Sequence, residues 1–224
     1  MKTVILSSQN KGKIKEISEI LGKYDMEVIT RDDAGLPGDE IEENGSTFEE
    51  NSYIKAAAIR DMIDADPKFE RYADSPVIAD DSGLMVDALG GAPGVYSARY
   101  AGEGCTFEDN VRKLLSELEG LPAEKRGGKF ATVITIVYPN AELAPAAAVR
   151  EGDRYILRAY GECKGRIAEE RSGEGGFGYD PVFIPEGYEE TFAVLGSELK
   201  NKISHRANAL AELEKKLEDG SPIK

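Results

Sequence analysis

Strand-like apolar runs alternate along this chain with segments whose apolar residues recur at helical spacing, and this alternation limits the fold more than any other sequence feature. Residues 4–6 form a short apolar run, and residues 14–21 follow with helical spacing. Residues 130–138 and 155–160 are rich in apolar side chains typical of strands and are predicted to pair. The pattern predicts an α/β fold, and the paired central strands predict a mixed rather than a purely parallel sheet.

Helix-capping signals place further helices along the chain. Thr47 is followed three residues later by Glu50, the arrangement of a capping box, and Thr106 with Asp109 opens another helix. The last helix has its apolar face on residues 203–217. No internal repeat or flexible linker interrupts this order.

Charge and composition exclude several classes of protein. The chain has 224 residues, with 28 Lys and Arg against 42 Asp and Glu, so its formal charge is −14. Such a surface repels a polyanion, and nucleic-acid binding is not expected. The apolar runs are too short for a membrane span or a signal peptide, and Cys105 and Cys163 match no metal or redox spacing. We therefore expect one cytoplasmic domain, residues 1–224, without a membrane partner.

A local concentration of cations in an acidic protein suggests an anionic ligand. One cluster lies at the start of the first predicted helix, where backbone N–H groups and the helix dipole favour an anion. Its residues are Ser8, Gln9, Asn10, Lys11, Gly12 and Lys13. Lysines in the first turn of a helix lie unfavourably near the positive end of its dipole, and departures from such local preferences are typical of functional sites. A solvated, lysine-rich helix end is the alternative for this segment taken alone.

The adjacent carboxylates Asp80 and Asp81 follow an apolar run at residues 77–79, and the Ser-Gly pair after them predicts a turn at the end of that strand. Oxygen ligands in a tight turn suit Mg²⁺, and a carboxylate beside the metal could accept the proton of an attacking water. A plain Asp-rich turn fits the spacing equally well. The acidic run at residues 39–43 could supply a second metal ligand, although most such runs are only solvated.

Two segments in the second half of the chain carry candidate substrate contacts. One is a glycine-rich stretch whose aromatic ring could stack on a base, although a turn with a packed ring explains it too; it ends in Phe177, Gly178, Tyr179 and Asp180. The other is a basic cluster at the start of the last helix, where arginine could bind phosphate or base oxygens. A solvated basic face is the alternative for this cluster, which comprises Lys200, Lys202, His205 and Arg206.

Five segments taken together resemble the inosine triphosphate pyrophosphatase family, also called the non-canonical purine nucleoside triphosphate pyrophosphatases. They are SSQNKGKIKEI at residues 7–17, TFEENSYIKA at 47–56, VIADDSGLMVDALGGAPGVYSARYAG at 77–102, GEGGFGYDPVF at 173–183 and KNKISHRANAL at 200–210. The resemblance covers nearly the whole chain, and the long middle segment is its most specific part. Residues 64–75 and 140–154 look like insertions relative to the family.

The resemblance implies an elongated, two-lobed α/β fold with an active cleft between the lobes, and a homodimer. It implies that residues 8–13 bind the triphosphate, that Asp81 is the proton acceptor and a Mg²⁺ ligand, and that Ser82 contacts the substrate. Glu42 best matches the second metal-binding carboxylate, with Glu43, one residue along, as the alternative. The positions that match base and phosphate contacts are residues 177–180, Lys200, His205 and Arg206.

The activity that the resemblance implies is hydrolysis of ITP, dITP and XTP to the monophosphate and pyrophosphate. Water would attack at the α–β phosphoanhydride, with Asp81 taking a proton and Mg²⁺ plus Lys13 stabilising the developing charge. Three alternatives stay open: a pyrophosphatase for modified pyrimidine nucleotides, a nucleotide-sensing module without hydrolysis, and glycoside hydrolysis by a carboxylate pair. The lysine clusters do not fit the last of these.

Overall fold

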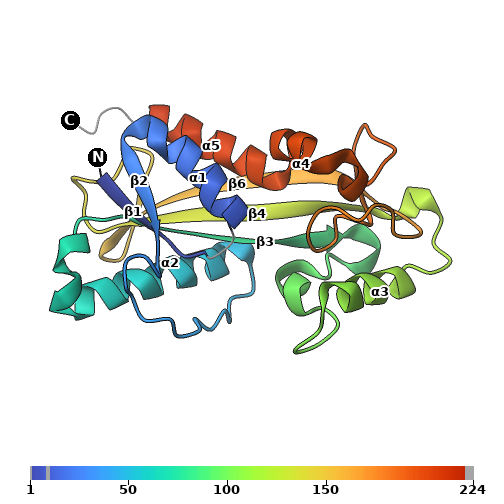
Figure 1. Ribbon diagram of the computed structural model, residues 1–224, viewed down its shortest axis with the longest axis horizontal. Coiled ribbons are helices and arrows are strands. Elements are labelled where there is room, and N and C mark those ends of the chain that lie inside the picture. The colour runs from blue at the N-terminus through green and yellow to red at the C-terminus, as the bar shows by residue number, and fades with distance from the viewer. Residues whose placement is uncertain (1, 9–10, 220–224) are drawn as a thin grey trace. The chain divides into compact units, whose positions relative to one another are not determined.

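The computed structural model describes residues 2–8 and 11–219 of the chain (Figure 1). Its strands are β1 (Lys2–Leu6), β2 (Met26–Thr30), β3 (Val77–Val86), β4 (Gly127–Tyr138), β5 (Val149–Glu151), β6 (Arg154–Ile167) and β7 (Phe183–Pro185). Its α-helices are α1 (Lys11–Leu21), α2 (Phe48–Ala65), α3 (Phe107–Glu117), α4 (Phe192–Ile203) and α5 (His205–Asp219). Short 3-10 helices lie at Gly22–Tyr24, Pro67–Tyr72, Asp87–Leu89, Gly94–Arg99 and Ala123–Lys125.

The strands of the described residues form one seven-stranded sheet of mixed direction. The strand order is β2-β1-β3-β4-β6-β5, and β7 pairs with β6 away from this path. β1 is parallel to β2 and β3, whereas β5 and β7 are antiparallel to β6. The predicted mixed α/β fold is therefore confirmed, as is the pairing of the two central strands, β4 and β6.

The chain divides into two compact units, each with its own hydrophobic core. Unit 1 comprises residues 1–81, 133–159 and 210–224, and unit 2 comprises residues 82–132 and 160–209. In unit 1, Ile5 and Val77 pack with Ile59 of α2. In unit 2, Leu84 and Phe130 belong to a cluster with Leu114 of α3. Burial of this apolar surface is the main source of stability in each unit.

The two predicted capping signals are both present as capping boxes. Thr47 Oγ1 accepts the Glu50 N–H at 3.1 Å, and Thr106 Oγ1 accepts the Asp109 N–H at 3.2 Å. In each case the acidic side chain also accepts the backbone N–H of the capping threonine. These local bonds fix where α2 and α3 begin, and therefore which of their residues face the sheet.

The expectation that a strand ends in a turn at Asp80 is wrong, because β3 continues from Val77 to Val86. An Asp-rich turn would let water solvate the carboxylates, but here both carboxylates are held by lysines, so the strand continues without a turn. Among the strands and α-helices of the described residues, β2, β5, β7 and α4 were not predicted. β2 is a short edge strand, and α4 precedes the expected last helix, from which Ser204 separates it.

Both cysteines of the chain are free thiols in the structure. Burial raises the pKa of the Cys163 thiol to about 11, while Cys105 is partly exposed. Among the residues described, no helix has both the length and the apolar character needed to cross a bilayer.

In unit 2, β6 meets the start of α5 so closely that only glycine fits at position 161. A Cβ atom added to Gly161 would lie 2.1 Å from the carbonyl oxygen of His205 and 2.2 Å from the backbone nitrogen of Ala209. Both atoms belong to the backbone, so they cannot swing away as a flexible side chain could. This contact places the first turn of α5, and with it His205, against β6.

We expect Gly161→Ala to lower the free energy of unfolding by about 1–3 kcal/mol, because the backbone of α5 must shift to admit the methyl group. Urea unfolding measures the change. Gly22→Ala is the matched control, since a Cβ there meets no atom within 4 Å, and it should alter stability by less than about 0.5 kcal/mol. Equal stability of the two variants would contradict the close approach of β6 and α5.

Candidate active site

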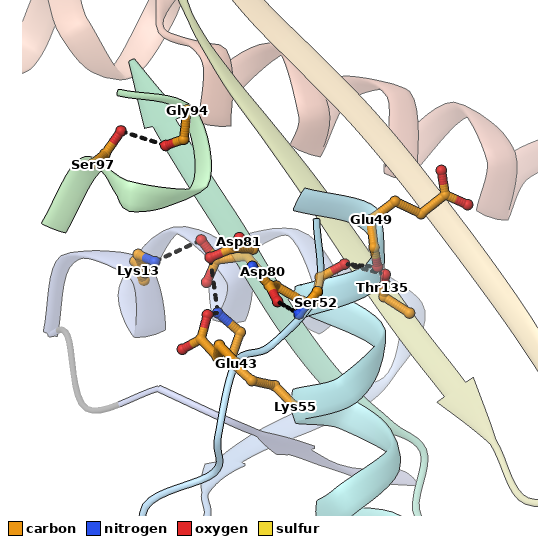
Figure 2. A network of polar contacts seen from close by, with 12 residues as sticks. Lys13, Glu43, Glu49, Ser52, Lys55, Asp80, Asp81, Gly94, Ser97 and Thr135 are labelled. Atoms are coloured by element: carbon orange, nitrogen blue, oxygen red, sulfur yellow. Dashed lines mark hydrogen bonds and ion pairs between the residues drawn. The ribbon is translucent and has the colours of Figure 1, made fainter. Parts of the chain in front are cut away.

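Two consecutive carboxylates in β3 are each paired with a lysine from a different helix (Figure 2). Asp80 Oδ2 accepts from Lys13 Nζ of α1 at 2.6 Å, and Asp81 Oδ1 accepts from Lys55 Nζ of α2 at 3.0 Å. Successive side chains of a strand point to opposite faces, and Figure 1 shows α1 and α2 on opposite sides of the strands of unit 1. The two negative charges are therefore neutralised separately, one on each face.

Asp81 belongs to a network in which two carboxylates converge on one ammonium group. Lys55 Nζ donates to Glu43 Oε2 at 2.9 Å as well as to Asp81. The buried Asn51 amide hydrogen-bonds Asp81 and accepts the Gly45 N–H at 2.8 Å. Asn51 thus ties the acidic segment that precedes α2 to the middle of β3. We call Lys13, Glu43, Lys55, Asp80 and Asp81 the carboxylate–lysine cluster.

Burial acts in opposite directions on the pKa values of Asp81 and Lys55. Burial raises the pKa of Asp81 above its ordinary value, and it outweighs the opposing effect of the Lys55 ammonium. Burial lowers the pKa of Lys55, but the carboxylates of Asp81 and Glu43 outweigh it, and the net pKa is raised. Lys55 therefore keeps its charge, while Asp81 binds a proton more readily than an exposed aspartate. That property suits a proton acceptor.

The predicted anion-binding segment leads from β1 into α1. Ser7 donates its N–H to the Ile78 carbonyl at 2.9 Å, which fixes the end of β1 beside β3, the strand that carries Asp80 and Asp81. Ser8 lines a hollow of about 230 Å³ in unit 1, together with Ser7, Arg31, Asp32 and Gly38. Gln9 and Asn10 lie outside the described residues, as does the side chain of Lys11. Gly12 belongs to the first turn of α1.

In unit 2 a buried carboxylate holds the glycine-rich loop. Asp180 is 0% exposed, and its Oδ2 accepts from the Phe177 N–H at 2.7 Å and from Lys200 Nζ at 2.5 Å. A Cβ added at Gly176 would lie 2.4 Å from the same oxygen, so the loop passes close to Asp180 only because residue 176 is glycine. The Phe177 ring, in contrast, is 59% exposed. Asp180 and Lys200 therefore support the loop from within, and Phe177 faces solvent.

The other predicted positions in unit 2 divide between buried and accessible ones. Tyr179 is buried, and its hydroxyl donates to the Ser97 carbonyl at 3.0 Å. His205 is also buried and stacks on Phe130, with 5.0 Å between ring centroids. The remaining predicted positions are Ser82, next to Asp81 on β3, Gly178, and Arg206 in the first turn of α5. Lys202 differs from its neighbours, because it forms an exposed i,i+4 pair with Glu198 and belongs to a solvated face.

Sequence reasoning missed Lys55 and Asn51, which contact Asp81 directly. Their spacing could have indicated them: Asn51 and Lys55 are four residues apart in a helix that Thr47 caps, and residues four apart lie on the same face of a helix. The structure also separates the two candidate glutamates. Glu43 is half-buried and paired with Lys55, whereas Glu42 is exposed.

Asp81 and Glu43 are the residues of the carboxylate–lysine cluster that could hold a divalent cation, which would take the place of the Lys55 ammonium between them. Asp81 and Glu43 already place two carboxylate oxygens around one positive charge, and hard oxygen donors suit Mg²⁺. Within the described part of the chain, no three His, Cys, Asp or Glu side chains form a group that could hold a metal. Mg²⁺ often uses one or two carboxylates and takes its other ligands from water and phosphate, so a two-carboxylate site is sufficient.

Comparisons with known proteins agree with the resemblance drawn from the five segments. A protein-family model described as the Ham1 family matches residues 4–216. A Bacillus subtilis protein named dITP/XTP pyrophosphatase is 44% identical over 218 residues, which cover 97% of this chain and 98% of the relative. A Bacillus cereus protein of the same name is 42% identical over 97% of this chain and 95% of its own. A solved HAM1 protein from Coxiella burnetii matches with a TM-score of 0.81 at 36% identity, covering 98% of this chain and 100% of that one.

We expect Lys55→Met to lower the free energy of unfolding by about 2 kcal/mol in metal-free buffer, because it leaves two partly buried carboxylates without their shared cation. Chemical denaturation gives the value. Lys15→Met is the matched control on α1: its side chain is 78% exposed and its pair with Glu19 should contribute less than about 0.5 kcal/mol. A Lys55 variant as stable as the control would mean that the cluster does not depend on this lysine.

Proposed function

Because this chain belongs to the Ham1 family, and relatives that cover nearly all of it are named dITP/XTP pyrophosphatases, we propose that it hydrolyses non-standard purine nucleoside triphosphates. The substrates are dITP, XTP and ITP, and the products are the monophosphate and pyrophosphate. The observation that carries the proposal is the partly buried Asp81 carboxylate, held by Lys55 and Asn51 within the most specific of the family-like segments.

In the proposed reaction, a water oxygen attacks the α-phosphorus and the bond from that phosphorus to the α–β bridging oxygen breaks. The water gives its proton to Asp81, whose raised pKa matches this role, and pyrophosphate leaves as one unit. Lys13 and Lys55 supply positive charge for the phosphates, and both are already oriented by carboxylates. Groups positioned before the reaction stabilise developing charge without reorganising, which is the larger part of catalysis at such sites.

The proposal includes Mg²⁺ as the cofactor. Asp81 would hold it together with Glu42 or Glu43, and the bound metal would neutralise phosphate charge and polarise the attacking water. The sequence favours Glu42 through its family-like position, and the geometry favours Glu43 through its convergence with Asp81 on Lys55. Each glutamate supplies the same kind of oxygen, so a direct comparison of single variants decides between them.

Base recognition is assigned to residues of unit 2. The exposed ring of Phe177 offers a face on which a purine can stack. Arg206 and His205 carry N–H donors, which can pair with the 6-oxo group of hypoxanthine or xanthine but not with the 6-amino group of adenine. A site built around such donors rejects adenine, because binding it would leave the donors unpaired.

The remaining expectations, a homodimer and a cytoplasmic location, belong to the same proposal. The resemblance implies the dimer, and the free thiols of Cys105 and Cys163 fit a reducing compartment. Light scattering on the purified protein measures the oligomeric state directly.

We expect Asp81→Asn to fold normally and to lose about 10²- to 10⁴-fold in pyrophosphate release from dITP, because the amide cannot take up the proton of the attacking water. Steady-state kinetics with Mg²⁺ measure the loss. Asp74→Asn, a change at an exposed aspartate just before β3, is the control and should keep the wild-type rate. Wild-type turnover in Asp81→Asn would remove this residue from the mechanism.

The metal requirement is tested by chelation and by the two glutamates. We expect a chelator to abolish turnover, Mg²⁺ to restore it, and replacement of the ligating glutamate by Gln to raise the half-saturating Mg²⁺ concentration by about tenfold or more. Glu42→Gln and Glu43→Gln are compared with Glu40→Gln, which changes an exposed residue of the same acidic run. If neither Glu42→Gln nor Glu43→Gln changed the Mg²⁺ dependence, the second carboxylate would be absent from the site.

A further inference from the structure

The Phe177 ring faces solvent on a loop whose contacts fix the backbone of Phe177 but not the direction of its ring. Asp180 holds the Phe177 N–H, and the flanking Gly176 and Gly178 have φ values of 86° and 63°, which only glycine adopts readily. These contacts fix the position of the Phe177 backbone. They leave the direction of the ring to whatever the ring itself touches.

The ring of Phe177 packs against Phe107, the first residue of α3. The two ring centroids are 4.5 Å apart and the ring planes are inclined at 66°, which is a favourable edge-to-face arrangement. Phe107 is 46% exposed, and the capping box of Thr106 and Asp109 holds the helix start that carries it. The contact therefore joins a rigid helix end to the most exposed ring of the loop.

A second contact joins the same two segments but is weaker. Arg171, just before the glycine-rich stretch, pairs with Glu108 of α3 at 2.6 Å, and both side chains are about half exposed. Ion pairs that water and salt can reach contribute little. Between the contacts lies a hollow of about 200 Å³, lined by Val111, Gly175, Gly176 and Pro181 among others. If Phe107 were truncated, the Phe177 ring could rotate toward this space.

We propose that Phe107 is a positioning residue that holds the Phe177 ring in the direction needed to stack on the nucleotide base. The inference rests on the proposed function, because it assigns Phe177 to the base. The start of α3 then sets the affinity for the base without touching the phosphates. Removing Phe107 should raise KM and leave kcat nearly unchanged, because the stacking contact is made equally in the bound substrate and in the transition state.

The test compares Phe107→Leu with wild type for dITP hydrolysis. We expect KM to rise by about three- to tenfold, the range of an aromatic pair contact, while kcat stays within about twofold. Phe107→Tyr should restore the wild-type KM. In Phe107→Leu combined with Phe177→Leu, the increase in KM should equal that of Phe177→Leu alone, since Phe107 acts only through Phe177. Inhibition by inorganic triphosphate, which has no base, should be unchanged.

Controls separate this role from general damage to the fold. Arg171→Gln removes only the exposed ion pair and should change KM by less than about twofold. Tyr160→Leu removes an equally exposed aromatic ring on β6, and its KM should be that of wild type. NMR relaxation of the Phe177 ring should report greater ring mobility in Phe107→Leu than in wild type, a readout that does not depend on turnover.

The outcomes are distinct. An unchanged KM in Phe107→Leu, or a fall in kcat accompanied by weaker inhibition by inorganic triphosphate, would overturn the proposal. If the wild-type protein hydrolysed no purine nucleotide, the proposed function would fail. Greater mobility of the Phe177 ring in Phe107→Leu would then still support the hold on the ring, and equal mobility would refute it.

Discussion

Two neighbouring carboxylates can be buried in one strand only if each finds its own cation, and the arrangement of unit 1 follows from this constraint. Asp80 and Asp81 point to opposite faces of β3 because successive strand residues alternate. Each therefore needs a lysine from a different side of the sheet, and Lys13 of α1 and Lys55 of α2 meet that need. An unpaired buried carboxylate would be costly, so the positions of both helices are coupled to the charges of β3.

The same pairing prepares the chemistry. Lys55 lies between Asp81 and Glu43, and burial raises the pKa of Asp81 although a cation is in contact with it. A phosphate group or a divalent cation entering this cluster would meet charges that are already fixed in direction. In unit 2, Asp180 and Lys200 play the corresponding structural part, because they hold the loop that carries Phe177. Asp80 and Asp180 are buried and their lysine partners are largely buried, whereas the ring that we assign to the base is exposed.

Local signals in the sequence predicted much of this architecture. The mixed α/β fold followed from the alternation of patterns, and the threonines that cap α2 and α3 were found because a capping box is a bond between near neighbours in the chain. The continuity of β3 was not predicted, since Asp80, Asp81 and the following residues are turn formers, and only partners distant in sequence make them acceptable in a strand. Lys55 was not predicted for the same reason, because its partner Asp81 lies 26 residues further along the chain.

The most direct test of the account is to identify the products that the purified wild-type protein forms from dITP, XTP, dGTP and dATP, with Mg²⁺ and with chelator. We expect fast, Mg²⁺-dependent conversion of dITP and XTP to equal amounts of monophosphate and pyrophosphate, with dATP much slower. Release of orthophosphate and a nucleoside diphosphate, or equal rates with all four nucleotides, would contradict the account.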